Sequence, residues 1–300
     1  YRLVKKNLEI NKLNNNLSNA GFLPTIDISG KQEYGVSDQS NNPTAFIQEI
    51  LKSESINASA NLKWTLFNGF RLLANKEKLK QLEYLSNGNL TLIIENTIQG
   101  IILSYYNCLL QKKRLDILET VVNLSKERLL YQKTKYDIGI TSKIELLQTE
   151  TTLFSDSSNL IIQKMNYNNS IKNLNIILGV DLESKWKLSD KMSENTQLFN
   201  YNELKSKTLT NNTNMINQII NNEIIKQDIR ISKSAYLPIV SFNSGSTYNQ
   251  STYDIGSSNY EGDNTGKTLN YYANISVNLR LYDGGKYRKI LKESKIKHDI

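Results

Sequence analysis

The sequence predicts a mostly α-helical fold that also contains four β-strands, and three observations carry this prediction. A helical pattern without proline runs from about residue 70 to a turn at Gly139, and a second pattern returns to about residue 178. Segments 57–66 and 271–281 alternate apolar and polar side chains. The order helix, strand, loop, strand and helix occurs twice, so the chain contains an internal repeat.

Composition narrows the class of protein. The 300 residues include three prolines, one cysteine and one histidine, His298, and carry a formal net charge of +8. A single cysteine excludes an intrachain disulfide framework, and a single histidine removes most metal clusters and catalytic triads. The lysines are spread along helical patterns, which indicates solvated helix faces. We therefore expect no enzyme activity, no cofactor, no metal site and no nucleic-acid partner.

The first helix is expected over residues 1–23 and stops at Gly21-Phe22-Leu23-Pro24. Proline disfavours the helical conformation at the residue before it, so we expect a strand over 25–29, followed by a polar excursion over 34–56. No signal peptide is visible, and both chain ends fall inside helical patterns, which indicates a mature or trimmed segment.

The segment Asn57–Leu66 has one apolar and one polar face. The apolar face consists of Ala58, Ala60, Leu62, Trp64 and Leu66, and the polar face of Asn57, Ser59, Asn61, Lys63 and Thr65. About ten residues is the length of a tilted strand that crosses a bilayer, with apolar side chains toward lipid. A strand with one face on a soluble core fits this segment equally well.

The long helical hairpin is expected over residues 68–178, with its tip at 136–147. Gly139 suits the left-handed position after the first arm, and Thr141 or Ser142 can cap the second arm. A heptad seam runs from Ile94 through Cys108, Leu115 and Val122 to Tyr136, and an offset second seam from Leu103 to Tyr131. An ordinary antiparallel coiled coil needs one seam, whereas a ring of helices needs two.

The second copy of the repeat begins at Ala235-Tyr236-Leu237-Pro238. A polar loop is expected over 244–269 and a strand over 271–281, which ends in Tyr282-Asp283-Gly284 where the first copy has Phe67-Asn68-Gly69. Four strands cannot close a barrel, and an open edge in lipid leaves backbone groups unsatisfied. Three copies, giving twelve strands, are the economical solution. In such a barrel Leu62, Trp64, Leu66, Val277, Leu279 and Leu281 would face lipid, and Lys63 and Arg280 the lumen.

In these motifs the chain resembles the outer membrane efflux protein family, the TolC-like channel-tunnels. The resemblance rests on the two Leu-Pro junctions, the Asn68-Gly69 and Asp283-Gly284 turns, and the tip around Gly139 with Glu145 and Leu147 after it. The segment Leu178–Leu182 also fits, where family members enter a small equatorial region. The asparagine-rich stretches 14–16 and 211–214 depart from the family pattern and are explained by coding bias.

The resemblance implies long coiled-coil helices that form an α-barrel through the periplasm, and a trimeric twelve-stranded β-barrel in the outer membrane. It implies passive export of small molecules or proteins, as the exit duct of a tripartite efflux or type I secretion system with a periplasmic adaptor (membrane fusion protein) and an inner-membrane transporter. It also implies adaptor docking at Ile138, Gly139 and Ile140, and a gate at Glu145 with Arg128 and Lys143 as basic candidates. The competing hypothesis is a structural or adaptor-type periplasmic coiled-coil protein with a soluble β-domain.

The expected regions follow the repeat. They are a tunnel helix (1–23), a β-hairpin with outer loop (24–67), the helical hairpin (68–178), an equatorial region (179–212), a tunnel helix (213–237), a second β-hairpin with outer loop (238–282) and the start of a further tunnel helix (283–300), whose hairpin the chain lacks.

Overall fold

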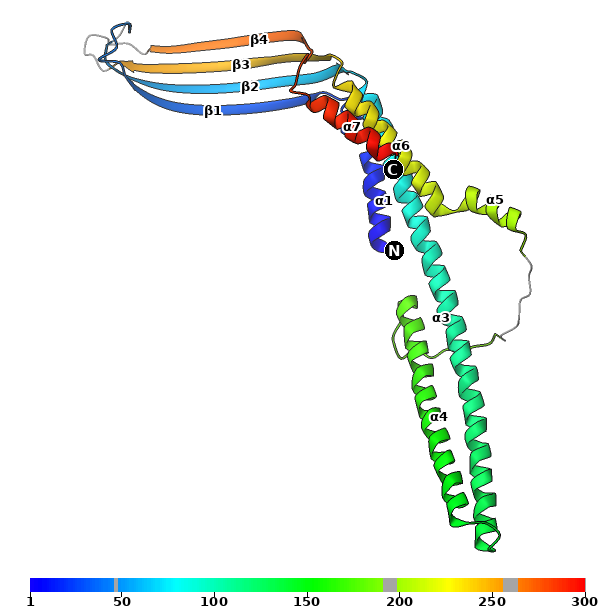
Figure 1. Ribbon diagram of the computed structural model, residues 1–300. Helices are drawn as coiled ribbons and strands as arrows, with labels where there is room; N and C mark the ends of the chain where they lie inside the picture. Colours follow the sequence, from blue (N-terminus) through cyan, green and yellow to red (C-terminus); the bar gives the residue numbers. More distant parts are fainter. Residues whose placement is uncertain (46–47, 191–198, 256–263, 300) are drawn as a thin grey trace. The chain divides into compact units, whose positions relative to one another are not determined.

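The computed structural model describes residues 1–45, 48–190, 199–255 and 264–299, and these contain seven helices and four strands (Figure 1). The chain divides into two compact units. One unit comprises residues 90–212 together with Tyr1, and the other comprises 2–89 and 213–300. Helix α3, Arg71–Asp137, contributes residues to both units.

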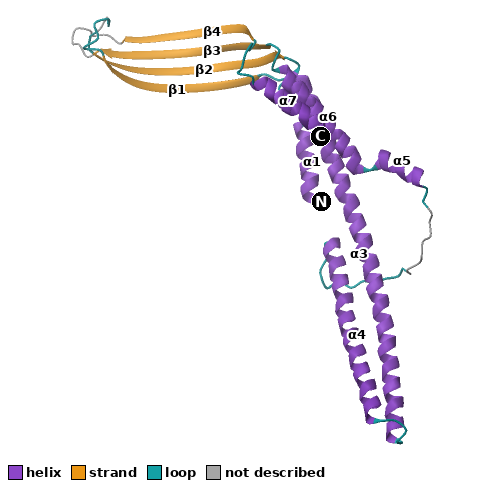
Figure 2. Cartoon of the chain, viewed as in Figure 1, coloured by secondary structure: helices purple, strands orange, loops and turns teal. Residues whose placement is uncertain are grey.

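The unit of residues 2–89 and 213–300 contains all four strands and most of the short helices. Its elements are α1 (Arg2–Asn14), α2 (Leu17–Ala20), β1 (Thr25–Asp38), β2 (Ile50–Asn68), the first part of α3, α6 (Thr213–Ser234), β3 (Ile239–Ile255), β4 (Asn264–Asn278) and α7 (Lys286–Asp299). The strands lie side by side in one antiparallel sheet in the order β1-β2-β3-β4 (Figure 2). Helices α6 and α7 pack against each other at one end of that sheet.

The strands are longer than the sequence patterns predicted. Much of 34–56 and of 244–269, expected as polar loops, belongs to β1, β2, β3 and β4. These expectations were wrong because serine, threonine, asparagine and tyrosine alternate there without an apolar face, so no hydrophobic period marks the strand. Pairing of β1 and β3 with β2, and of β4 with β3, supplies the hydrogen bonds that hold these segments extended.

Strand β4 ends earlier than the sequence pattern predicted. Pairing of β4 with β3 begins at Asn264 opposite Tyr253 and ends at Asn278 opposite Ile239. The expected strand over 271–281 therefore stops three residues early, because β3 starts only at Ile239, directly after Pro238, which lacks the N–H that a ladder needs.

The other unit is built on the helical hairpin of α3 and α4 (Lys143–Leu178), followed by α5 (Tyr201–Asn211). The predicted first seam of α3 is buried at Cys108, Leu115 and Val122. Polar pairs cross the same interface: Gln163 donates to the side chain of Gln111 at 2.9 Å, and Ser125 to Asp156 at 2.5 Å. Polar groups at such positions fix the register of two antiparallel helices, because a shift would leave them buried without partners.

The hairpin turn has the predicted geometry. Gly139 has φ +77°, and its N–H donates to the Tyr136 carbonyl while that of Ile140 donates to the Lys135 carbonyl, each at 2.9 Å. This bond pair is a Schellman motif with glycine at C′. Ser142 is the N-cap of α4 and accepts a hydrogen bond from the Glu145 N–H. The two predictions for this turn are confirmed.

The predicted second seam of α3 stays exposed in this chain. Leu103, Ile117 and Tyr131 are each more than 60% exposed.

Among the described residues no helix combines the length and apolarity needed to span a membrane. No group of three or more histidine, cysteine and acidic side chains in the described part of the chain lies close enough together to hold a metal ion.

Candidate functional site

The sheet has two chemically distinct faces. Paired residues of antiparallel strands share a face, so the register places Ile26, Leu62, Ser244 and Ala273 in one row, and Trp64, Phe242 and Ile275 in the next. Further rows add Ile28, Ala60 and Tyr271. These residues form the apolar face. The residues between them, such as Asn61, Thr247 and Asn274, form the polar face.

The apolar face is open over much of its area. Along β2, Ala58, Ala60, Trp64 and Leu66 are exposed, while Leu62 is half-buried. Ile28 is 85% exposed and Val277 68%. A soluble sheet has the opposite arrangement, with its apolar side covered by a second layer. Within the described residues no layer covers this face.

The apolar part of that face has a defined extent. Beyond the row of Gly30, Ala58 and Tyr248, the same face carries Lys52, Glu54, Asp254 and Lys267. Ile56 is the last apolar residue of β2 before Glu54, so the apolar stretch of this strand covers residues 56–66. This corresponds to the ~9–11 residues with which a tilted strand crosses a bilayer.

The predicted facing residues divide into two groups. Leu62, Trp64 and Val277 lie on the apolar face, and Lys63 lies on the polar face. Leu66 lies in a β-bulge between Thr65 and Phe67, where one extra residue interrupts the alternation. Leu279, Arg280 and Leu281 follow the last paired residue of β4, so strand pairing does not set their direction. For all of the predicted facing residues, the assignment to lipid or lumen stays a prediction.

Trp64 has a second role that the sequence pattern did not reveal. Its indole N–H donates to the Phe22 carbonyl at 2.8 Å. The ring thereby joins β2 to the segment that connects α2 with β1. An amphipathic tryptophan at the edge of the apolar stretch is typical of membrane–water interfaces.

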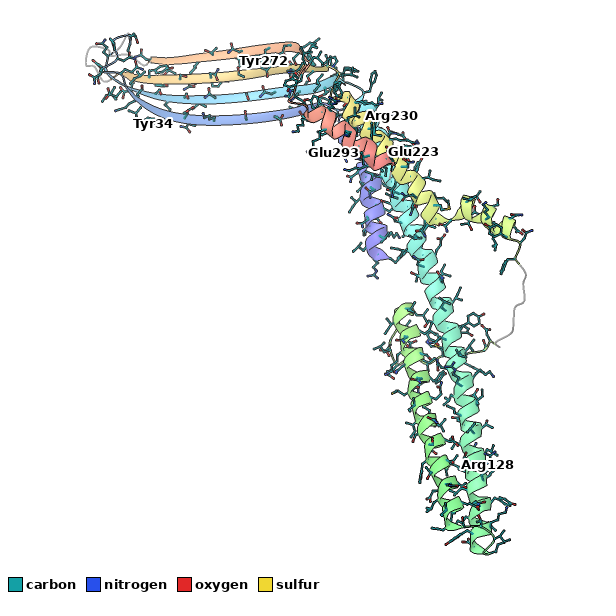
Figure 3. All side chains as sticks on the ribbon, viewed as in Figure 1. Tyr34, Arg128, Glu223, Arg230, Tyr272 and Glu293 are labelled. Atoms are coloured by element: carbon teal, nitrogen blue, oxygen red, sulfur yellow. The ribbon has the colours of Figure 1, made fainter. Side chains whose placement is uncertain are left out.

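The polar face also contains an aromatic ring. The Tyr272 hydroxyl donates to the Asn61 side chain at 2.7 Å, which takes the ring from β4 across β3 to β2 (Figure 3). A Cβ at Gly245 of β3 would lie 2.8 Å from that hydroxyl oxygen. Sequence reasoning missed this arrangement because it expected Gly245 in a polar loop, whereas the structure places it inside β3, where a glycine often marks a close approach.

The tip of the helical hairpin exposes apolar side chains. Ile138 is 65% exposed and Ile140 69%, and a Cβ at Gly139 between them would meet open space. Ile144, in the first turn of α4, is 68% exposed and was missed by the sequence prediction because it belongs to a helical pattern. We call Ile138, Ile140 and Ile144 the tip patch.

The three gate candidates do not lie together. Arg128 and Glu145 line one polar groove of about 330 Å³, together with Gln132 and Gln148. The Glu145 carboxylate accepts hydrogen bonds from Thr141 and, at 3.3 Å, from Gln132. The Lys143 ammonium group instead lies 5.3 Å from the centre of the Tyr136 ring. Of the two basic candidates, Arg128 therefore shares the groove with Glu145, and Lys143 does not line it.

A long helical hairpin joined to a four-stranded sheet with an exposed apolar face defines the subunit fold of an outer-membrane channel. The family model described as "Outer membrane efflux protein" matches residues 7–180, more than half of the chain. The chain belongs to this family, and membership places it at the outer membrane with extension into the periplasm. The resemblance inferred from the sequence is confirmed.

Solved structures agree on the fold. The Campylobacter jejuni CmeC outer membrane channel matches with a TM-score of 0.77 at 17% identity, covering 99% of this chain and 62% of that one. The outer-membrane channel OprN matches with 0.77 at 15%, covering 99% and 65%. The open state of the Neisseria gonorrhoeae MtrE outer membrane channel matches with 0.69 at 13%, covering 99% and 64%. The chain thus spans less than two thirds of these channels. A search of curated proteins found no match.

Proposed function

We propose that the protein is a passive export channel of the outer membrane, formed by three copies of the chain. The observation that carries this proposal is the apolar face of the sheet, which is largely exposed, bounded at one end by rows with charged side chains and as tall as a membrane-spanning strand requires. Lipid is the solvent that such a face needs, because in water its isoleucine, leucine and aromatic side chains would favour aggregation.

Assembly follows from the unpaired edges. Strands β1 and β4 each pair on one side only. In hydrocarbon every backbone group has to be hydrogen-bonded, so β4 of one copy pairs with β1 of the next until the barrel closes. The exposed second seam of α3 supports the same arrangement, since neighbouring helices of a ring would cover Leu103 and Ile117.

The tip patch supports the proposal that a partner protein binds at the turn of the helical hairpin. Three exposed isoleucines around a turn form a small apolar surface, which a helical hairpin of a periplasmic adaptor could cover by groove packing. The adaptor would in turn connect the channel to an inner-membrane transporter that supplies the energy. Small-molecule efflux and type I protein secretion both use this arrangement.

The decisive experiment compares neighbouring residues on the two faces of β2. Leu62→Arg should destabilise the membrane-inserted protein by about 2–4 kcal/mol if the site lies near the bilayer midplane, whereas Lys63→Arg on the polar face should be tolerated. Stability is measured as the loss of the folded band on unheated gels after extraction with detergent. Equal tolerance of both variants, or a protein that is soluble without detergent, would favour the adaptor-type coiled-coil protein instead.

Docking at the tip is tested with two glycines of matched backbone strain. Gly139 and Gly179 both have positive φ and open space around a Cβ, but only Gly139 lies at the tip. Gly139→Leu should abolish export while the trimer remains in the membrane, and Gly179→Leu should preserve export. Export by both variants would exclude the tip as the docking point.

The gate is tested at the polar groove. Glu145→Ala should raise the conductance in planar bilayers at neutral pH, because it removes the carboxylate that accepts hydrogen bonds from Gln132 and Thr141 and the negative charge of the groove that Arg128 also lines. Glu127→Ala removes an exposed carboxylate from the preceding helix outside that groove and should leave the conductance unchanged. The same conductance in all three proteins would make Glu145 a capping residue only.

A further inference from the structure

The polar face of the sheet carries very few charges. In the described strands its ionisable side chains, apart from tyrosines, are Asp27, Lys31 and Glu33 of β1 and Lys63 of β2. The described residues of β3 and β4 contribute none to this face. Two acids and two bases cancel, although the whole chain carries a formal charge of +8. The excess positive charge of the protein therefore lies elsewhere.

The four charges are also arranged to cancel locally. The Lys31 ammonium group lies 2.7 Å from the Glu33 carboxylate, on the same face of β1. Asp27 is paired with Asn61 and Lys63 with Thr25, so Asp27 and Lys63 are diagonal neighbours on adjacent strands. Each acidic group thus has a basic group close by, and the field of the pair falls off faster than that of a single charge.

Amides and hydroxyls make up most of the remaining surface, and they hydrogen-bond to one another. The Ser29 and Ser59 hydroxyls lie 2.8 Å apart, Asn61 donates to Ser59 at 2.9 Å, and Asn243 donates to Asn274 at 3.1 Å. Together with the Tyr272 bond to Asn61, these contacts connect side chains across all four strands. The face offers dipoles and the tyrosine rings of Tyr253 and Tyr272 to a solute, but little net charge.

We infer that this face lines a pore segment that does not select solutes by charge, an inference that rests on the proposed channel function. Charged rings in a lumen set ion preference, and lumen substitutions tune it. A lumen of amides and hydroxyls instead replaces part of the hydration shell of uncharged and zwitterionic polar solutes. The outer-membrane segment therefore admits such solutes as readily as ions of either sign, and any charge selection arises outside this segment.

The test measures the reversal potential of single channels of the purified protein in planar bilayers under a KCl gradient. The parent protein should show K⁺ and Cl⁻ permeabilities within about threefold of each other, as expected for a pore without a charged ring. Lys63→Gln should shift the preference toward K⁺, and Asp27→Asn toward Cl⁻. Lys267→Gln removes the same charge from the opposite face of the sheet and should leave the reversal potential at the parent value.

The outcomes separate the inference from the proposed function. A protein that gives no channel steps would contradict the channel function itself. Channels that conduct but prefer one ion by more than about tenfold, or that respond equally to Lys63→Gln and Lys267→Gln, would overturn the uncharged lumen while the channel function stands. Opposite shifts for Lys63→Gln and Asp27→Asn, with no shift for Lys267→Gln, would establish it.

Discussion

The chain passes from a strand into a helix twice, through Asn68-Gly69-Phe70-Arg71 and through Asp283-Gly284-Gly285-Lys286. The two turns have similar backbone conformations but different neighbouring atoms. Both place two successive residues at positive φ: 65° and 67° in the first turn, 73° and 83° in the second. A Cβ at Gly69 would lie 2.5 Å from the Ser234 carbonyl oxygen, whereas a Cβ at Gly284 would meet no atom within 4 Å.

This difference shows that the repeated motif serves two purposes. In both turns the first glycine permits a left-handed conformation. Only in the first turn does it also let the backbone approach the end of α6, which belongs to the second copy of the repeat. The first turn is therefore part of the packing between the two repeats, and the second is a local feature of the chain.

The largest effect is expected from alanine at the two first glycines. Gly69→Ala should destabilise the protein by about 3 kcal/mol, because it adds a clash with Ser234 and Leu237 to the cost of the left-handed backbone. Gly284→Ala should cost only about 1–2 kcal/mol, the backbone term alone. Thermal unfolding in detergent, followed by circular dichroism, measures both. Equal losses of stability in the two variants would mean that the close approach of Gly69 to α6 does not contribute to stability.

A smaller effect is expected at the residues that cap the following helices. Asp283 accepts hydrogen bonds from the N–H groups of Gly285 at 3.0 Å and Tyr287 at 2.7 Å, while Asn68 accepts one from Leu72 at 3.1 Å. Asp283→Ala should therefore cost about 1–2 kcal/mol and Asn68→Ala about 1 kcal/mol. Urea titration of the two variants compares them directly, and a larger loss for Asn68→Ala would contradict the ranking.

The smallest effect is expected at Phe70, which stands where the second turn has Gly285. It is the one non-glycine residue with positive φ in the described part of the chain, and its ring packs edge-on against Phe67 with centroids 5.2 Å apart. In Phe70→Gly the relief of about 1–2 kcal/mol of backbone strain is offset by lost ring packing and by the flexibility of glycine. The melting temperature should stay within a few degrees of the parent. A large drop would show that the ring, rather than the turn, holds this junction.

Sequence reasoning succeeded where the determinants are local. The hairpin turn depends on Gly139 and Ser142, whose conformational and capping preferences act over four or five residues, so both positions could be predicted. The Leu-Pro junctions are equally local. The strand lengths could not be predicted in this way, because the outer halves of β1, β2, β3 and β4 carry no hydrophobic period and stay extended only through pairing with one another.

The candidate sites show the same division. The two faces of the strands follow from alternation, and the register confirms which side chains share a face. No periodicity predicts the hydrogen bond from Trp64 to Phe22 or the position of the Tyr272 ring over Gly245. The same holds for the different surroundings of the Lys143 and Glu145 side chains. Spacing placed Arg128, Lys143 and Glu145 near one level of the hairpin, but helix rotation decides which of them line one groove.

The sequence by itself determined the long hairpin, the repeat and the amphipathic strands, because helix and strand periods, proline junctions and glycine turns are encoded within a few residues. Only the tertiary structure decided where β4 ends, which turn is wedged against α6 and how the four charges of the polar face are balanced. These features arise from pairing and close approach between segments far apart in the chain, where a shift of one residue would move a side chain to the other face of the sheet.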